Sequence, residues 1–187
     1  MFSRMDILGF WQKCAITPSR LPDVKREADL VVKFKPLYDP VADATKVPWW
    51  VIGAIDDREE GFDHKGYLGN GDPLTKKTIH VPRGRGPFKN WSEGAIDAIH
   101  TSGWDILPSG GHWDIVTCLL KCEAYNGEGY EHRGLRSPYL FGATNMQQRG
   151  KYTSDGHWDG NAWDSQVGVA AIFLALKQFH GVDLNEA

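Results

Sequence analysis

The chain has 187 residues, a formal net charge of -3 and a pI near 6.1. This length is typical of one domain, residues 1–187, that can bury a core without disulfides. The slightly acidic balance argues against a nucleic-acid partner, and the sequence lacks the apolar run of about 18 residues that stable membrane insertion requires.

The first half of the sequence is predicted to be helical, with a break before a small sheet. Residues 5–46 are interpreted as two or three short helices, with Pro36 as an interruption. A further helix is predicted from Pro48 to about Glu60, ended by Gly61. Residues 66–81 combine a Gly/Asn/Pro turn with β-branched residues, which predicts a small hairpin or sheet.

The second half alternates helices with glycine-rich loops. Helices are predicted from Ser92 to Gly103, from His112 to Tyr125 and from Asp164 to Phe179. Residues 127–163 are rich in Gly, Tyr, Trp and Asn without periodicity, and a loop this long is usually functional. These elements predict an α+β fold that is mainly α.

Metal chemistry has little support in the sequence. The three cysteines, Cys14, Cys118 and Cys122, form neither a disulfide framework nor a zinc pattern, and we expect the last two to be core residues. The seven histidines show no helical ligand pair. We therefore expect no metal and no cofactor.

Four carboxylates crowd the end of the helix that starts at Pro48, and helical phase separates them. At about 100° per residue, Glu59 projects within roughly 30° of the centre of an apolar stripe, whereas Asp57 and Glu60 lie off it. The stripe is formed by Pro48, Val51, Ile52 and Ile55. Desolvation, neighbouring negative charge and the helix dipole would all raise the pKa of Glu59. A carboxyl protonated near neutral pH can donate its proton to a glycosidic oxygen. A helix-terminal Glu that simply reaches solvent is the alternative.

The turn Asn70-Gly71-Asp72-Pro73 follows this helix closely. Asp72 is the candidate second carboxylate, to hold a water or to stabilise positive charge at the sugar, with turn capping as its alternative role. Thr75 and Thr78 follow on the same predicted hairpin and are candidates to orient a water.

Several ordered blocks resemble a lysozyme-like family of phage endolysins and bacterial peptidoglycan hydrolases. The resemblance spans roughly residues 10–178. Its blocks are, in order, Val47–Ile55 with Arg58-Glu59, Asn70–Thr75, His80-Val81-Pro82, Trp91-Ser92-Glu93, Glu123–Gly127, Ser137–Leu140, Thr144-Asn145, Gly150-Lys151-Tyr152 and Asp155-Gly156.

The resemblance implies a lysozyme-like fold, mainly helical, with a small sheet after the helix that ends in the catalytic Glu. By position that residue is Glu59. The resemblance also implies that residues downstream line the glycan groove with Asn70, Thr75 and Thr78. These residues are Tyr125, Asn126, Tyr139, Thr144 and Asn145.

Three positions depart from the family pattern near Glu59. Asp56 stands where a His is expected, Glu60 where a small Ser is expected, and Gly69 where a His is expected. These departures leave Glu59 in place but change the charges around it.

The function implied is that of a muramidase, which cleaves the β-1,4 bond between N-acetylmuramic acid and N-acetylglucosamine. A lytic transglycosylase, or a non-catalytic peptidoglycan-binding module, is the alternative. The expected partner is bacterial peptidoglycan, and the expected state is a monomer. The polar N-terminal run predicts no signal peptide, which implies synthesis in the cytoplasm and release to the cell wall through a holin.

Overall fold

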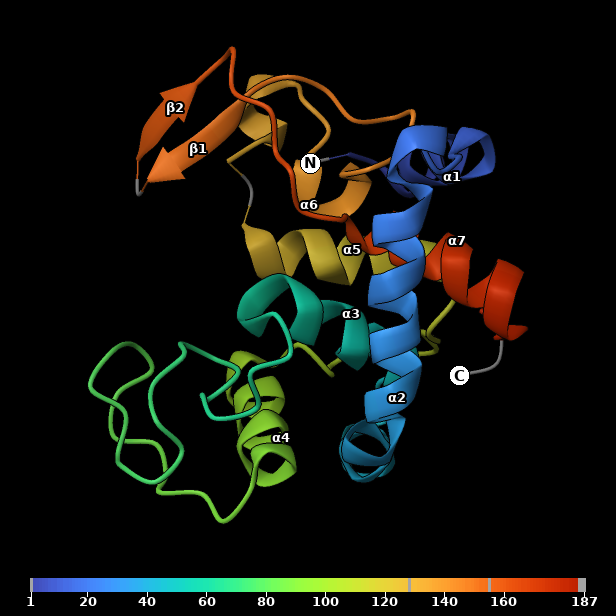
Figure 1. The fold of residues 1–187 in the computed structure, drawn as a ribbon. Coiled ribbons are helices and arrows are strands. Elements are labelled where there is room, and N and C mark those ends of the chain that lie inside the picture. Colours follow the sequence, from blue (N-terminus) through green and yellow to red (C-terminus); the bar gives the residue numbers. More distant parts are fainter. Residues whose placement is uncertain (1, 128, 155, 185–187) are drawn as a thin grey trace. The chain divides into compact units, whose positions relative to one another are not determined.

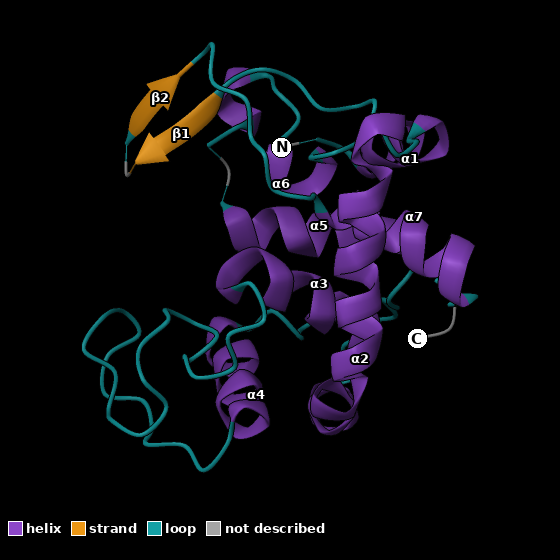
Figure 2. Ribbon diagram, in the orientation of Figure 1, coloured by secondary structure: helices purple, strands orange, loops and turns teal. Residues whose placement is uncertain are grey.

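The computed structural model describes residues 2–127, 129–154 and 156–184 (Figure 1). The described residues are mainly helical with one small two-stranded antiparallel sheet (Figure 2), which confirms the mainly α member of the α+β class. The chain groups into two compact units. The first contains the residues up to Ala28 and those from Asp114 onward, and the second contains Asp29–Trp113.

The first unit is built around its helices. These are α1 (Arg4–Lys13), the start of α2 (Leu21–Thr45), α5 (Ile115–Asn126), α6 (Pro138–Phe141) and α7 (Val169–His180), with short 3-10 turns at Pro18–Arg20 and Glu131–Arg133. Helix α5 contacts α1, α6 and α7. Cys118 and Cys122 are fully buried free thiols on α5, which confirms them as core residues.

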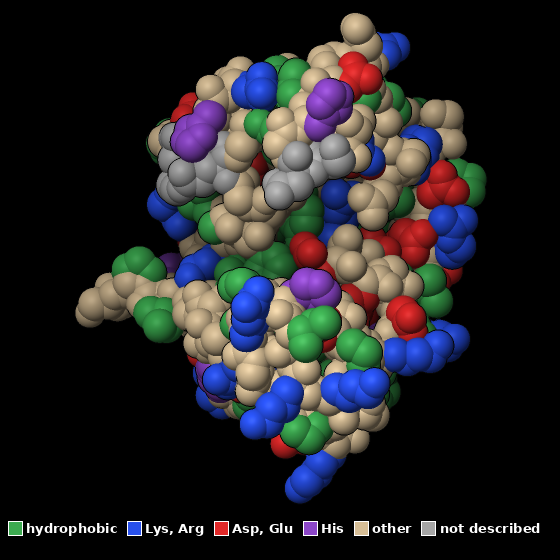
Figure 3. All heavy atoms as spheres, turned by 90° about the vertical axis from the view of Figure 1, so that its left-hand side faces the viewer, with side chains coloured by type: hydrophobic (Ala, Val, Ile, Leu, Met, Phe, Trp, Pro, Cys, Tyr) green, Lys and Arg blue, Asp and Glu red, His purple; other side chains and the backbone are tan. Residues whose placement is uncertain are grey.

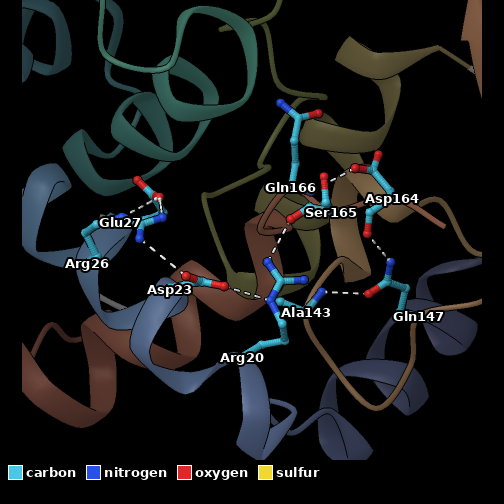
Figure 4. A network of polar contacts seen from close by, with 9 residues as sticks. All are labelled: Arg20, Asp23, Arg26, Glu27, Ala143, Gln147, Asp164, Ser165 and Gln166. Atoms are coloured by element: carbon cyan, nitrogen blue, oxygen red, sulfur yellow. Dashed lines mark hydrogen bonds and ion pairs between the residues drawn. The ribbon is translucent and has the colours of Figure 1, made fainter.

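A polar network connects the start of α2 to two loops of the first unit (Figure 4). Arg20 bonds the Asp23 carboxylate through Nε at 2.9 Å and donates from Nη2 to the Ser165 carbonyl at 2.7 Å. The Gln147 side chain accepts from the Ala143 amide and donates to the Asp164 carbonyl. The bonds to Ser165, Ala143 and Asp164 satisfy backbone groups that regular structure leaves unpaired.

The sheet of the first unit lies near the C-terminal end of the sequence. Strands β1 (Lys151–Ser154) and β2 (His157–Asp159) pair antiparallel, with Tyr152 opposite Trp158. The two rings lie 5.0 Å apart, and the Arg133 guanidinium lies 4.4 Å from the Trp158 ring. Aromatic cross-strand pairs of this kind stabilise short hairpins.

The hairpin predicted for residues 66–81 is wrong, because this segment contains only an isolated bridge between Gly66 and Pro73. Prolines at 73 and 82 lack the N–H that a ladder needs. The side chains of Asp72 and Thr78 bind the backbone groups that would otherwise pair between strands. The sheet formed by β1 and β2 lies instead within residues 127–163, which the sequence predicts to be a loop.

The second unit contains the rest of α2, α3 (Trp49–Glu60) and α4 (Trp91–Ser102). Helix α2 continues through Pro36 and Pro40, so the predicted interruption at Pro36 is wrong. Tertiary packing outweighs the lost helical bonds. A Cβ added at Gly53 of α3 would lie 2.6 Å from Val31 and 2.8 Å from Tyr38, so the two helices approach closely at that glycine.

Helix ends follow their capping residues. The predictions for α3 and α4 are confirmed to within a residue, and Gly61 and Gly103 end them in the left-handed conformation. Helix α5 starts later than predicted because Asp114 caps it, accepting from the Thr117 amide. Helix α7 also starts later, because the Asp164 carboxylate binds the Gln166 amide in a turn instead of capping the helix.

Candidate functional site

A cleft of about 300 Å³ lies at the C-terminal end of α3 in the second unit. The last two helical residues, Glu59 and Glu60, both line it. The loop that follows α3 supplies the remaining lining residues, which are Asp63, Lys65, Gly66, Gly71 and Pro73. Three carboxyl groups and one ammonium group therefore surround a space large enough for a small polar ligand or part of a polymer.

Glu60 is the enclosed carboxyl of this pair. Its Oε2 accepts a hydrogen bond from the Trp91 indole Nε1 at 3.2 Å, and its buried Oε1 has no hydrogen-bond partner. Burial is the main cause that raises the pKa of Glu60 to about 7, and the charges of Asp56 and Asp63 act in the same direction. The Trp91 bond and His64 oppose this rise. Glu60 therefore carries a proton over part of the neutral pH range.

Glu59 is exposed, which contradicts the burial that helical phase predicts for it. The prediction assumed that only one face of α3 is buried, but every residue from Trp50 to Asp56 is buried, so helical phase does not distinguish the faces. At the end of the helix, the loop that follows covers Glu60 instead. Glu59 thus lines the cleft and is exposed to solvent.

A buried polar cluster lies one helical turn before Glu60. The Asp56 carboxylate is fully buried, and its Oδ2 lies 2.6 Å from the Tyr38 hydroxyl, which donates to it, and 2.7 Å from His64 Nε2. The imidazole is packed between aromatic rings, with its centroid 4.5 Å from that of Phe34 and 5.1 Å from that of Trp91. Asp56 Oδ1 has no hydrogen-bond partner.

Sequence reasoning missed this cluster, although it noted that Asp56 replaces an expected His. The structure shows that an imidazole is nevertheless present beside position 56, because His64 reaches it from the loop. A buried Asp requires a partner. The apolar neighbours of Asp56 on α3 were the available signal that a donor should be sought nearby.

Asp72 anchors the loop before α4. Its Oδ2 accepts from the amides of Ile79 and His80 at 2.8 and 2.9 Å, and its Oδ1 lies 2.8 Å from His80 Nδ1. Hydrogen bonds from His80 are the largest cause that lowers the pKa of Asp72. Asn70 supports the same turn, accepting from the Asp72 amide and donating to the His80 carbonyl.

The two threonines of this loop differ in their surroundings. Thr75 is exposed. Thr78 is buried, and its hydroxyl donates to the Pro82 carbonyl at 2.6 Å and accepts from the Arg85 amide at 3.0 Å. The structure thus places Glu59, Asn70, Asp72, Thr75 and Thr78 in one unit. The Thr78 hydroxyl is engaged by the backbone of its own loop.

The other candidate groove residues belong to the first unit. Tyr125 and Asn126 are half-buried at the end of α5, and Asn126 Nδ2 is a buried donor without a hydrogen-bond partner. Tyr139 and Thr144 are buried, and the Thr144 hydroxyl donates to the Phe141 carbonyl. The exposed Asn145 ties the end of α1 to its own loop, accepting from the Ala15 amide and donating to the Lys13 carbonyl.

Glu123 is another buried carboxyl, and sequence reasoning did not propose it as a site residue. It lies on α5 at 4% exposure, and the Ser137 hydroxyl donates to its Oε2. Burial is the main cause that raises the pKa of Glu123 to about 7. Its position among apolar residues of a predicted helix was the signal that could have identified it.

No group of three or more His, Cys, Asp or Glu among the described residues is arranged to hold a metal ion. Within the same residues, no helix is both long and apolar enough to cross a lipid bilayer. Comparison of the chain with protein-family models, with curated proteins and with solved structures gave no match.

Proposed function

We propose that this protein is a glycosidase that cleaves the β-1,4 bond between N-acetylmuramic acid and N-acetylglucosamine in bacterial peptidoglycan. The observation that carries the proposal is the pair Glu59 and Glu60 at the end of α3, which line one cleft and differ in burial. Sugar-cleaving enzymes use carboxyl groups in unlike environments to donate and to receive protons. The ordered sequence blocks that resemble phage endolysins support the same class and a lysozyme-like fold.

Glu59 is the proposed proton donor. Glu60 is too enclosed to reach a polymer, because its Oε2 binds the Trp91 indole and its Oε1 is buried. Glu59 faces the cleft and is reachable by a glycan. A bound sugar would displace water from Glu59 and so favour its protonated form.

The remaining residues of the second unit take supporting roles in this proposal. Protonation of Glu60 over part of the neutral pH range lowers the negative charge at the cleft, and Asp56 and His64 of the buried cluster shift the pKa of Glu60 in opposite directions. Asp72 holds the loop that forms one wall of the cleft, since its oxygens are engaged by the backbone of that loop. The group that attacks the sugar is water in a muramidase and the muramic acid 6-hydroxyl in a lytic transglycosylase.

The test compares Glu59→Gln with Glu60→Gln in a turbidity assay on purified cell walls. Each change removes an ionisable proton with little change in shape. We expect Glu59→Gln to lower the rate by at least about a hundredfold, the scale of a general acid, and Glu60→Gln to lower it by less than about tenfold. A larger loss of lysis rate in Glu60→Gln than in Glu59→Gln would identify Glu60 as the proton donor.

Full lysis by both variants would overturn the glycosidase assignment. Mass spectrometry of the released muropeptides separates the two reactions, because reducing ends and 1,6-anhydro ends differ in mass by a water molecule. Wall binding without any lysis by the unmodified protein would support the binding-module alternative.

A further inference from the structure

A twenty-residue stretch of the second unit is free of acidic residues and rich in cations. Residues 73–92 contain no Asp or Glu, although the whole chain has a net charge of -3. The cations of this stretch are Lys76, Lys77, Arg83, Arg85 and Lys89. Positive charge is thus strongly concentrated in one loop of a slightly acidic protein.

Most of this charge is available to a partner. We name residues 76–85 the basic loop. Arg85 is paired with Asp97, but Lys76, Lys77 and Arg83 are exposed and form no ion pair with any described residue. In Figure 3, Lys and Arg side chains are spread over the lower part of the face drawn, with apolar side chains among them.

The basic loop also exposes two large apolar side chains. Ile79 is 69% exposed and Val81 is 78% exposed, with the exposed His80 between them. Single apolar residues on a surface are common, but a pair between lysines and an arginine is a combination of an apolar anchor with positive charge. Interfacial membrane-binding segments have this combination, with apolar groups in the headgroup region and cations near lipid phosphates.

Internal hydrogen bonds hold the basic loop in this shape. The Asp72 carboxylate binds the amides of Ile79 and His80, and the Thr78 hydroxyl bridges the Pro82 carbonyl and the Arg85 amide. The Thr78 amide also donates to the Arg85 carbonyl. Because the backbone is already ordered, docking costs little conformational entropy.

We propose that the basic loop docks the protein peripherally on an anionic lipid surface. Lys76, Lys77 and Arg83 would contact lipid phosphates, and Ile79 and Val81 would enter the headgroup region. A soluble polyanion such as a wall polymer or a nucleic acid would use the same cations but would leave both apolar side chains in water. The exposed apolar pair therefore favours a lipid surface, and this inference does not depend on the glycosidase proposal.

The test is sedimentation of the full chain with vesicles of phosphatidylglycerol mixed with phosphatidylcholine, and with vesicles of phosphatidylcholine alone. We expect salt-sensitive binding to the anionic vesicles only. Lys76→Gln with Lys77→Gln should weaken binding by about fivefold for each lysine removed. Ile79→Ser with Val81→Ser should weaken it by about tenfold through lost apolar burial.

Matched controls come from exposed residues elsewhere. Lys13→Gln with Lys177→Gln removes two exposed cations of the first unit, and Ile106→Ser removes an apolar side chain that is 68% exposed. Both controls should bind like the unmodified protein. Absence of binding to anionic vesicles, or equal binding to both vesicle types, would overturn the proposal. Binding that depends on the lysines but is unchanged by Ile79→Ser with Val81→Ser would also overturn the proposal, because it would identify a site for soluble polyanions. Inorganic polyphosphate should then compete with the vesicles.

Discussion

Two consecutive residues at the end of α3 show how strongly a carboxyl depends on its surroundings. Glu59 is exposed, whereas Glu60 is half-buried against Trp91 and Gly66. The proposed reaction uses this difference, because Glu59 meets the substrate, whereas the pKa of Glu60 is raised to about 7. Their environments, rather than their chemistry, assign the two roles.

The pKa of Glu60 should respond to the hydrogen bond from Trp91. The indole N–H of Trp91 stabilises the ionised carboxylate and so lowers the pKa that burial raises. Trp91→Phe removes this donor, and we expect the pKa of Glu60 to rise above its value of about 7. Titration of the side-chain carboxyl carbon by NMR measures the change. A lower pKa in the variant would show that burial, not the indole bond, is reduced by the substitution.

Glu123 should make the protein less stable as the pH rises. Burial raises its pKa from 4.5 to about 7, so the folded state binds more protons than the unfolded state between these values. Its contribution is fully present below pH 4.5 and is lost as the pH rises through 7. The loss is of the order of 3 kcal/mol at most.

Glu123→Gln removes this ionisation while keeping a hydrogen-bonding side chain beside Ser137. We expect the variant to gain stability relative to the unmodified protein as the pH is raised from 5 to about 8. Urea unfolding at several pH values measures both free energies. Parallel pH dependences would mean that Glu123 does not ionise differently in the two states.

At the scale of elements, the contact between α2 and α3 depends on a glycine. A Cβ at Gly53 would meet Val31 and Tyr38 at less than 3 Å, so Gly53→Ala should destabilise the protein by about 1–3 kcal/mol. Gly9 of α1 is the matched control, since a Cβ there meets nothing within 4 Å. Gly9→Ala should stabilise the protein by up to about 1 kcal/mol through helix propensity. Thermal melting of both variants distinguishes the two effects, and equal shifts would contradict the close approach.

Helices with strong local signals could be predicted from the sequence. The ends of α3 and α4 follow from capping residues and terminal glycines that act within one turn. Two other predictions failed because distant contacts decided them. Helix α2 passes through Pro36 where packing with α3 supports it, and the segment after α3 uses side chains of Asp72 and Thr78 in place of a strand ladder.

The candidate site was predictable only in part, for the same reason. The crowding of carboxyls at the end of α3 could be read from the sequence, but the choice of the enclosed one could not. Enclosure of Glu60 comes from Trp91 and Gly66, which lie elsewhere in the chain. His64 could not be assigned to Asp56 because the conformation of the connecting loop sets that distance.

At the scale of the whole molecule, α2 belongs to both units. Its buried residues include Val24 in the first unit and Val41 in the second, and the helix is continuous between them. Helix formation is cooperative, so loss of either half should destabilise the other. We therefore expect the two units to unfold in one transition.

Two probes test this expectation in the same urea series. Labelling of the buried thiols Cys118 and Cys122 reports on the first unit, and hydrogen exchange of buried α3 amides such as Ile52 and Ile55 reports on the second. Coincident free energies are expected. A difference of more than about 1 kcal/mol would show separate unfolding of the two units.

The close approach of Gly66 to Glu60 links the side chains that these two positions can accept. A Cβ at position 66 would come within 2.6 Å of Glu60 Oε1, so the Glu60 carboxyl would have to shift to accept any residue other than glycine there. A larger residue at 66 therefore fits most readily when the side chain at 60 is short or turned away. Relatives of this chain should carry either a long residue at 60 with glycine at 66, or a short residue at 60 with a side chain at 66.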